Sequence, residues 1–445
     1  MLYKCCLDGI IDLIMSKKKE QRVIAYFDKI VGGGQSLGTL DDGRKIFAWG
    51  VLPDEKAEVL VTKKKSRYLE AVAETIIDAN SKIRALPKDP ESYLSTSPWQ
   101  IMTFEAEQHY KAALIEEAFE LHDIVLPNPI EVYSDGVEYG YRNKIEFSFW
   151  YDTYVNELSL AFFRRGTHGK LPVPGTSLAS PAITSAAEKV LAALNSLEVE
   201  GRALKTLLVR SAADGSVAWQ LYVKDEDFDA DVFMSKVEGS ENGEIIFSNP
   251  KSPASVITKR LTKPVESLSD TILSIPFTYA TEGFFQINLP VYEKALLDMK
   301  KWVPEGKPAV DMYSGVGTIG LTIGGPDVTL VEINEYAVAE MRRNIKSLGL
   351  SATAVLAASE DALEYITGDK TIILDPPRAG LHEAVVERLL GQLPERIVYL
   401  SCNPVTQARD VARLGGKYGI REHIGYNFFP RTPHIEHLVV LDLKK

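Results

Sequence analysis

Two short segments near the end of the chain place reactive side chains directly after apolar runs. Cys402 lies in Ser401-Cys402-Asn403-Pro404, after the run 397–400, and Asp375 opens Asp375-Pro376-Pro377-Arg378, after the run 372–374. Such runs predict buried strands, and ligands bind at the carboxyl edge of open α/β sheets. We therefore expect Asp375 and Cys402 to face one pocket, with Cys402 as a nucleophile. The alternative for Cys402 is an inert structural role, since free cysteines are among the most buried residues.

A glycine-rich loop follows an earlier apolar strand. Gly315, Gly317 and Gly320 match G-x-G-x-x-G, in which glycines let the backbone turn tightly and approach a ligand closely. Glu332 closes the next predicted strand, where a carboxylate can accept hydrogen bonds from two ribose hydroxyls. The pattern predicts a ribose-bearing cofactor, either a nicotinamide dinucleotide or S-adenosylmethionine.

Acidic residues favour S-adenosylmethionine. Asp311 ends the strand ahead of the glycine loop, which suits a cofactor with a cationic methionine end. The prolines after Asp375 fix the backbone of that turn, and in methyltransferases this position holds a planar base near the methyl donor. Glu436 stands at the mouth of the last apolar strand, and either Glu436 or one of its neighbours His434 and His437 is a candidate base. Taken in isolation, Glu436 would more often be a solvated loop residue.

The elements that must position these residues form a doubly wound α/β domain over residues 281–445. Apolar strands rich in Val, Ile and Leu alternate with helices, which is typical of a parallel sheet covered on both faces, here with a late antiparallel strand. The predicted strands are 309–313, 328–333, 352–356, 371–374, 396–400, 422–427 and 436–443, and the predicted helices are 318–324, 334–348, 360–366, 382–392 and 404–416.

Two further domains precede it. Residues 16–80 contain about five short strands with turn signals, which predicts an OB-type barrel. Residues 85–275 predict a β-rich central domain, with a helix at 104–122 that packs on the catalytic domain. Basic residues in both domains are candidate RNA contacts, although solvated charges explain them equally well; they are Lys63, Lys64, Arg142, Asn143, Lys144, Arg164 and Arg165.

Composition limits the remaining possibilities. Cys5, Cys6 and Cys402 are the only cysteines in 445 residues, which excludes a disulfide framework and a cysteine-rich metal site and suits a reducing cytosol. The first fifteen residues do not resemble a signal peptide, Met15 is a possible alternative start, and no run of 18 apolar residues predicts a membrane span. We expect a cytoplasmic monomer. The net charge of −11 does not exclude an RNA partner, because residues 16–70 hold 12 Lys/Arg against 8 Asp/Glu.

The combined motifs resemble the RNA uridine-C5 methyltransferases, which make 5-methyluridine in tRNA and 23S rRNA. The resemblance covers the barrel region, which is similar to the TRAM barrel of that family, and six motifs. They are Tyr141–Lys144, Phe284–Asn288, Asp311–Gly320, Asp375–Gly380, Ser401–Pro404 and Phe429–Glu436. It departs from the family at one place. Many members with the barrel carry an iron–sulfur cluster held by four cysteines, whereas the corresponding stretch here is Ser95-Thr96-Ser97-Pro98-Trp99-Gln100, so we expect no cluster.

The resemblance implies a role for each motif residue. Cys402 would be the nucleophile and Glu436 the base. The residues implied to contact S-adenosylmethionine are Gln286, Tyr313, Glu332 and Asp375, with Thr318 and Ser359 as weaker matches, and Asp311, Gly315 and Gly317 belong to the same loop. Thr318 stands where some members have asparagine.

The chemistry explains why these groups are needed. Uracil C5 becomes nucleophilic enough to attack a sulfonium methyl only after a thiolate has added to C6. We therefore expect a lowered pKa for Cys402. Two other functions are possible: amino-group methylation through Asp375-Pro376-Pro377-Arg378, which needs no cysteine, and a non-catalytic RNA-binding protein with a vestigial cofactor fold. A tRNA uridine and a 23S rRNA uridine both fit as the substrate.

Overall fold

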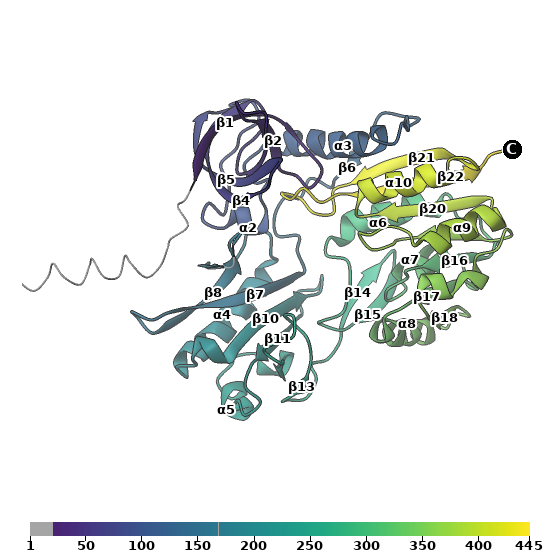
Figure 1. Ribbon diagram of the computed structural model, residues 1–445. Coiled ribbons are helices and arrows are strands. Elements are labelled where there is room, and N and C mark those ends of the chain that lie inside the picture. Colours follow the sequence, from purple (N-terminus) through teal and green to yellow (C-terminus); the bar gives the residue numbers. More distant parts are fainter. Residues whose placement is uncertain (1–20, 168) are drawn as a thin grey trace, which may run out of the picture. The chain divides into compact units, whose positions relative to one another are not determined.

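The computed structural model describes residues 21–167 and 169–445 (Figure 1). Cys5, Cys6, Met15 and the first residues of the predicted barrel lie outside the described residues. The chain divides into two compact units, the first ending at Ala85 and the second running from Leu86 to Lys445.

The first unit is a closed five-stranded barrel, as predicted. Its strands are β1 (Arg22–Ile30), β2 (Ser36–Thr39), β3 (Lys45–Trp49), β4 (Glu55–Lys64) and β5 (Tyr68–Asp78), in the order β1-β2-β3-β5-β4 with β4 closing onto β1. Inward-facing side chains such as Phe27, Ile46, Val59 and Leu69 are fully buried and form the core. Arg84 forms an ion pair with the buried carboxylate of Glu55, which ties the segment after β5 to the barrel.

The second unit contains the predicted mixed sheet, which has eight strands. They are β6 (Val132–Tyr133), β16 (Ala309–Met312), β17 (Thr329–Glu332), β18 (Thr353–Leu356), β19 (Thr371–Leu374), β20 (Arg396–Ser401), β21 (Tyr418–Tyr426) and β22 (Glu436–Leu443). The order is β18-β17-β16-β19-β20-β22-β21-β6. The first five strands in this order are parallel to one another, and β22 is antiparallel to both of its neighbours. The edge strand β6 comes from a distant part of the chain and was not predicted.

Helices cover both faces of this sheet. Side chains of α6 (Leu289–Lys300), α7 (Thr318–Ile323) and α8 (Glu335–Leu348) share one apolar core with the sheet, and those of α3 (Phe104–Glu120), α9 (Glu383–Gln392) and α10 (Pro404–Leu414) share the other. The sequence analysis missed α6. The predicted helix at 360–366 is wrong: the chain forms two 3₁₀ turns, Ser359–Asp361 and Leu363–Tyr365, which bury Ala362 and Ile366 without a continuous helix.

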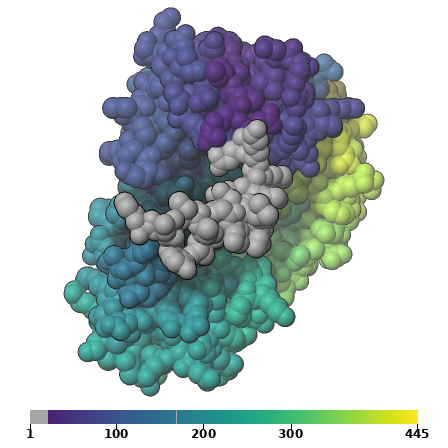
Figure 2. Space-filling model, turned by 60° about the vertical axis from the view of Figure 1, so that its left-hand side comes forward, coloured from purple at the N-terminus to yellow at the C-terminus, as the bar shows by residue number. Residues whose placement is uncertain are grey.

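The middle part of the second unit's sequence, residues 144–260, forms a seven-stranded sheet and contributes to the teal surface in Figure 2. Its order is β13-β12-β11-β10-β7-β8-β9, with α4 (Pro181–Ser196) and α5 (Ala230–Met234) packed in its core. The strands are β7 (Lys144–Asp152), β8 (Glu157–Phe163), β9 (Lys170–Pro172), β10 (Leu204–Ser211), β11 (Val217–Val223), β12 (Gly243–Phe247) and β13 (Lys259–Arg260).

The chain path links the two sheets of this unit. α3 and β6 belong to the eight-stranded sheet, the chain then forms the seven-stranded sheet, and it returns through the hairpin of β14 (Leu268–Ile272) and β15 (Ile275–Tyr279). The predicted division at 85–275 and 281–445 stays a prediction. Within the described ranges, no helix is long and apolar enough to cross a membrane.

Candidate active site

Three predicted site residues lie at one edge of the eight-stranded sheet. Asp375 follows β19, Cys402 follows β20, and Glu436 is the first residue of β22, the antiparallel neighbour of β20. Ser401 pairs with His437, so one further step in the same register brings Cys402 opposite Glu436. Side chains at opposite positions of an antiparallel pair project from the same face about 5 Å apart at Cβ.

Hydrogen bonds join the loops that carry these residues. The Nδ2 amide of Asn403 donates to the backbone carbonyl of Arg378 at 2.8 Å, and Thr406 Oγ1 donates to the same carbonyl at 3.2 Å. The Arg378 guanidinium lies 3.1 Å from Nδ1 of His434, two residues before Glu436. The three loops are therefore connected to one another, and the charge of Arg378 acts to lower the pKa of both Cys402 and Glu436.

The electrostatics of the site differ from the prediction. Burial, followed by the carboxylates of Glu436 and Asp375, raises the pKa of Cys402 to about 12, and Arg378 offsets only part of that rise. Burial also raises the pKa of Asp375, while burial and the nearby Asp375 carboxylate raise that of Glu436 well above its ordinary value. The expectation of a lowered pKa for Cys402 was wrong, because burial and two carboxyl groups raise that pKa by more than Arg378 lowers it.

Glu332 and Asp311 shape the glycine loop. Glu332 Oε2 accepts from the backbone N–H of Gly315 at 2.9 Å, and Asp311 Oδ2 accepts from that of Gly320 at 2.8 Å. Asp311 is fully buried, and its Oδ1 has no hydrogen-bond partner among the residues described. Gly317 has φ of +90°, and a Cβ there would lie 3.1 Å from Met341, so only glycine fits without strain.

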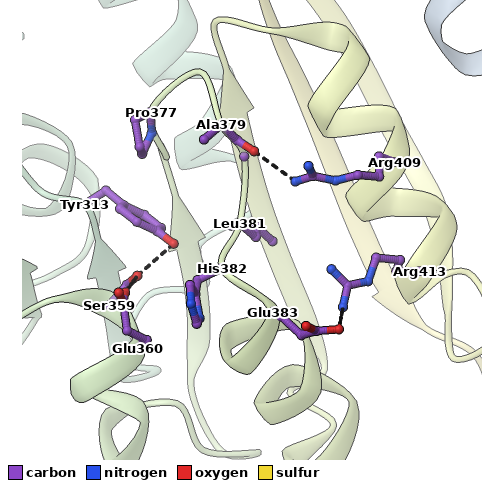
Figure 3. A pocket seen from close by; sticks show the side chains of 11 residues that line it. Tyr313, Ser359, Glu360, Pro377, Ala379, Leu381, His382, Glu383, Arg409 and Arg413 are labelled. Atoms are coloured by element: carbon purple, nitrogen blue, oxygen red, sulfur yellow. Dashed lines mark hydrogen bonds and ion pairs between the residues drawn. The ribbon is translucent and has the colours of Figure 1, made fainter.

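Tyr313 and Ser359 line a cavity beside these loops. Ser359 Oγ donates to Tyr313 Oη at 2.9 Å, and Tyr313 itself has an unusual φ of 66°. The cavity has a volume of about 470 Å³ and is also lined by residues of the segment 377–383 and by two arginines of α10 (Figure 3). Thr318 has a structural partner, since its Oγ1 lies 2.7 Å from the buried hydroxyl of Tyr292.

The predicted RNA contacts have diverse surroundings. Lys63, Lys64 and Arg164 are exposed, and Lys63 forms an ion pair with Glu70 at 2.8 Å. Arg165 is partly buried and donates to the backbone carbonyl of Leu94. Asn143 and Lys144 donate to backbone carbonyls of the segment that ends at Gln286. Their exposure therefore favours Lys63, Lys64 and Arg164 as the residues of this set that are able to contact RNA at the surface.

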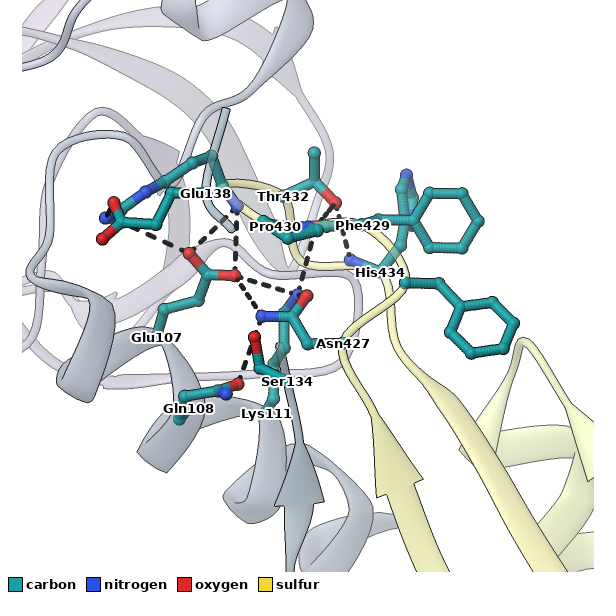
Figure 4. A network of polar contacts seen from close by, with 12 residues as sticks. Glu107, Gln108, Lys111, Ser134, Glu138, Asn427, Phe429, Pro430, Thr432 and His434 are labelled. Atoms are coloured by element: carbon teal, nitrogen blue, oxygen red, sulfur yellow. Dashed lines mark hydrogen bonds and ion pairs between the residues drawn. The ribbon is translucent and has the colours of Figure 1, made fainter. Parts of the chain in front are cut away.

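A buried ion pair that the sequence analysis missed holds the loop ahead of Glu436. Lys111 and Glu107 on α3 are fully buried and 3.0 Å apart. Lys111 donates to the Phe429 carbonyl at 3.1 Å, and the Glu107 carboxylate accepts from the backbone N–H of Arg431 at 3.0 Å (Figure 4). The i, i+4 spacing of a glutamate and a lysine was the only available signal, and it normally marks an exposed pair.

A polar network occupies the stretch 95–100, which was expected to correspond to the cluster cysteines of the family that the sequence resembles. Gln100 is buried, and its Nε2 donates to Ser97 Oγ at 2.7 Å and to Asp89 Oδ2 at 3.0 Å. Ser177 Oγ also donates to Asp89, at 2.8 Å, so side chains from three separate segments meet there. In the part of the chain that is described, no group of three His, Cys, Asp or Glu residues could hold a metal ion.

Known proteins resemble the chain over nearly its full length. An uncharacterized RNA methyltransferase of Fusobacterium nucleatum is 26% identical over 94% of this chain and 95% of its own. The tRNA (uracil(54)-C(5))-methyltransferase of Pyrococcus abyssi is 38% identical over 38% of this chain and 42% of its own. The crystal structure of the Pyrococcus abyssi tRNA (uracil-54, C5)-methyltransferase in complex with S-adenosyl-L-homocysteine has the same fold, with a TM-score of 0.74 and 23% identity over 94% of this chain and all of that one.

The fold and the motif-bearing sheet edge define an RNA methyltransferase with an α/β catalytic sheet and an N-terminal barrel. Residues 362–444 match the model of the tRNA (uracil-5-)-methyltransferase family, and this segment contains Asp375, Cys402 and Glu436. Over this segment the chain is similar to that family.

Proposed function

We propose that this enzyme methylates C5 of a uridine in structured RNA through a covalent bond between Cys402 and C6 of the ring. The proposal rests on one observation: Cys402 and Glu436 lie at adjacent ends of β20 and β22, at the same sheet edge where Asp375 follows β19. A nucleophile and a base on adjacent strand ends can act on neighbouring ring atoms of one base. The amino-group alternative gives no reason for either the thiol or Glu436.

Cys402 and Glu436 divide the reaction between them. The Cys402 thiolate adds to C6, which makes C5 a carbon nucleophile, and the methyl group is transferred to C5. Glu436 then takes the proton from C5, the electron pair reforms the C5–C6 double bond, and the C6–S bond breaks to release the thiolate. General-base assistance of this kind is typically worth about 10²–10⁴-fold in rate.

The residues around the glycine loop fit S-adenosylmethionine, which supplies an electrophilic methyl group when bound. Glu332 is half-buried at the end of β17, where it can accept from ribose hydroxyls, and the buried, unpartnered Oδ1 of Asp311 lies behind the loop. Gln286, Tyr313, Asp375 and Ser359 complete the proposed cofactor site, and Tyr313 and Ser359 already line a cavity. A relative's structure holds S-adenosyl-L-homocysteine, which supports this choice.

The positive charge of the cofactor can lower the pKa of Cys402 and so favour the thiolate. Two carboxyl groups raise the pKa of Cys402, so a cation bound among them must lower it. The sulfonium of S-adenosylmethionine carries such a charge, whereas the thioether product does not. We infer that the thiol is more reactive in the loaded enzyme than before the cofactor binds.

The substrate is a uridine in tRNA or in 23S rRNA. Two relatives from Pyrococcus species named for tRNA position 54 support tRNA. The purified enzyme should be incubated with S-adenosylmethionine carrying a labelled methyl group and with unmodified tRNA and 23S rRNA transcripts, and the nucleosides should be identified by mass spectrometry. Label in 5-methyluridine from one RNA is the expected result, and label only on base amino groups would contradict the proposal.

A further inference from the structure

The segment 280–286 connects β15 with the proposed cofactor site. Phe285 is buried and stacks on Tyr279 at the end of β15, with ring centroids 3.9 Å apart and planes 16° from parallel. Gln286 follows directly, so its position depends on how this short segment is held. No helix or strand contains these residues, and their backbone groups therefore need other partners.

Side chains of the seven-stranded sheet supply those partners. Asn143 Nδ2 donates to the backbone carbonyl of Gln286 at 2.9 Å. Lys144 Nζ donates to the Glu282 carbonyl at 3.0 Å and lies 3.4 Å from that of Gly283. The seven-stranded sheet thus holds the segment both at Gln286, the residue expected to bind the cofactor, and at Glu282 just before it.

Neighbouring strands of the same sheet reinforce this attachment. Arg210 on β10 is buried and donates to the Ala280 carbonyl at 3.1 Å. Gln220 and Arg260 each donate to the side chain of Glu282 at 2.8 Å. Together with Asn143 and Lys144, these contacts bind the segment to four strands or strand ends.

Helix α8, which packs on the eight-stranded sheet, also holds the segment. Glu340 on α8 accepts from the backbone N–H of Ala280 at 2.8 Å. Gly283 lies against the same carboxylate, since a Cβ there would be 3.3 Å from Glu340 Oε2. The segment is therefore fixed between the two sheets of the unit.

Lys144 and Asn143 are unsuited to phosphate contacts in this arrangement. Burial, followed by the charge of Arg210, lowers the pKa of Lys144 to about 8, and its ammonium already donates to a carbonyl. The Asn143 backbone carbonyl accepts from Ser211 N–H at 2.9 Å, which fixes the residue against β10. A phosphate contact would require both side chains to abandon these partners.

We propose that Asn143 and Lys144 are positioning residues that hold Gln286 at the cofactor site, and that they do not contact RNA. This inference rests on the proposed S-adenosylmethionine site. It assigns the motif Tyr141-Arg142-Asn143-Lys144 a different task from the one the sequence suggested: removal of either side chain should weaken cofactor binding and leave RNA binding intact.

The test compares two dissociation constants in each variant of the full chain. Asn143→Ala and Lys144→Met should raise the Kd for S-adenosylmethionine, measured by calorimetry, at least tenfold, and leave the Kd for tRNA or rRNA transcript, measured by filter binding, within twofold. Arg164→Ala, an exposed residue after β8, is the matched control and should show the reverse pattern. Weaker RNA binding with unchanged cofactor affinity in Asn143→Ala and Lys144→Met would overturn the inference.

A double-mutant cycle separates positioning from general destabilisation. If Asn143 acts through Gln286, then Asn143→Ala/Gln286→Ala should bind S-adenosylmethionine no more weakly than Gln286→Ala. Fully additive losses would contradict the inference, and Asn143→Leu, which keeps most of the volume but has no donor, replaces Asn143→Ala in the cycle if the alanine variant does not fold. Failure of the wild-type enzyme to bind S-adenosylmethionine at all would instead refute the proposed function.

Discussion

Cys402 and Glu436 flank Ser401 and His437, the last pair of the antiparallel ladder of β20 and β22, and the Glu436 carboxylate raises the pKa of Cys402. The two residues are adjacent in space although 34 positions separate them in the sequence. Between two parallel strands of this sheet, the residues that follow the strand ends face each other only through their loops. Because β22 runs antiparallel to β20, the start of β22 lies beside the end of β20. The side chains of Cys402 and Glu436 can therefore reach the same base.

Glu436→Gln should convert the enzyme into a trap. The glutamine cannot take the proton from C5, so the reaction should stop after methyl transfer with RNA still bonded to Cys402. Denaturing gel electrophoresis should then show a protein–RNA band that contains the labelled methyl group. Glu395→Gln is the matched control, because Glu395 is exposed and lies just before β20, at its opposite end. A Glu436→Gln variant that turns over without a trapped band would remove Glu436 from the role of base.

Alkylation of Cys402 by iodoacetamide should be slow and strongly pH-dependent. In a Cys5→Ser/Cys6→Ser background, a pKa of about 12 leaves Cys402 almost entirely protonated at pH 8, and the rate should rise nearly tenfold per pH unit up to pH 10. A rate that levels off near pH 7 would show a low thiol pKa and contradict the electrostatic account.

The cofactor's charge should change that reactivity. S-adenosylmethionine should increase the alkylation rate at pH 8 relative to S-adenosylhomocysteine, because the two differ at the sulfur by a methyl group and a positive charge. Glu436→Gln should also accelerate alkylation, since it removes a negative charge that raises the pKa of Cys402. Equal rates with both ligands would refute charge activation by the cofactor.

Lys111→Met should strongly destabilise the second unit. The substitution leaves the fully buried Glu107 carboxylate without its ammonium partner, which typically costs about 3–5 kcal/mol. Glu107→Gln/Lys111→Met removes both charges and should recover part of the loss. Urea denaturation measures the difference, with Lys189→Met as the control, because the exposed Lys189–Glu238 pair should contribute nothing measurable. Equal stability of Lys111→Met and the wild type would contradict the role of the pair.

The sequence predicted the catalytic sheet well for a physical reason. Strands buried on both faces, such as β16, β19 and β20, are continuous apolar runs and cannot be solvent-exposed loops. The two-residue strand β6 has no such signal, because it is recognised only by its pairing with β21. α6 did carry a signal, with Pro290 in its first turn and Val291, Ala295 and Met299 on one buried face, and was overlooked.

The site residues were also predictable from their motifs, but their interactions were not. Nothing local shows that Asn143 donates to Gln286, because 143 positions separate them. The raised pKa of Cys402 likewise depends on Asp375 and Glu436, which only the sheet order brings together. Long-range partners decide both the electrostatics and the division of labour between catalytic and positioning residues.

The covalent role of Cys402 is the central claim, and one measurement tests it most directly. Cys402→Ala should be incubated with 5-fluorouridine-substituted RNA and S-adenosylmethionine beside the wild-type enzyme, and the products resolved on a denaturing gel. The account predicts a stable adduct with the wild type, because a fluorine at C5 cannot leave as a proton, and neither an adduct nor turnover of ordinary RNA with Cys402→Ala. Methylation of ordinary RNA by Cys402→Ala would contradict it.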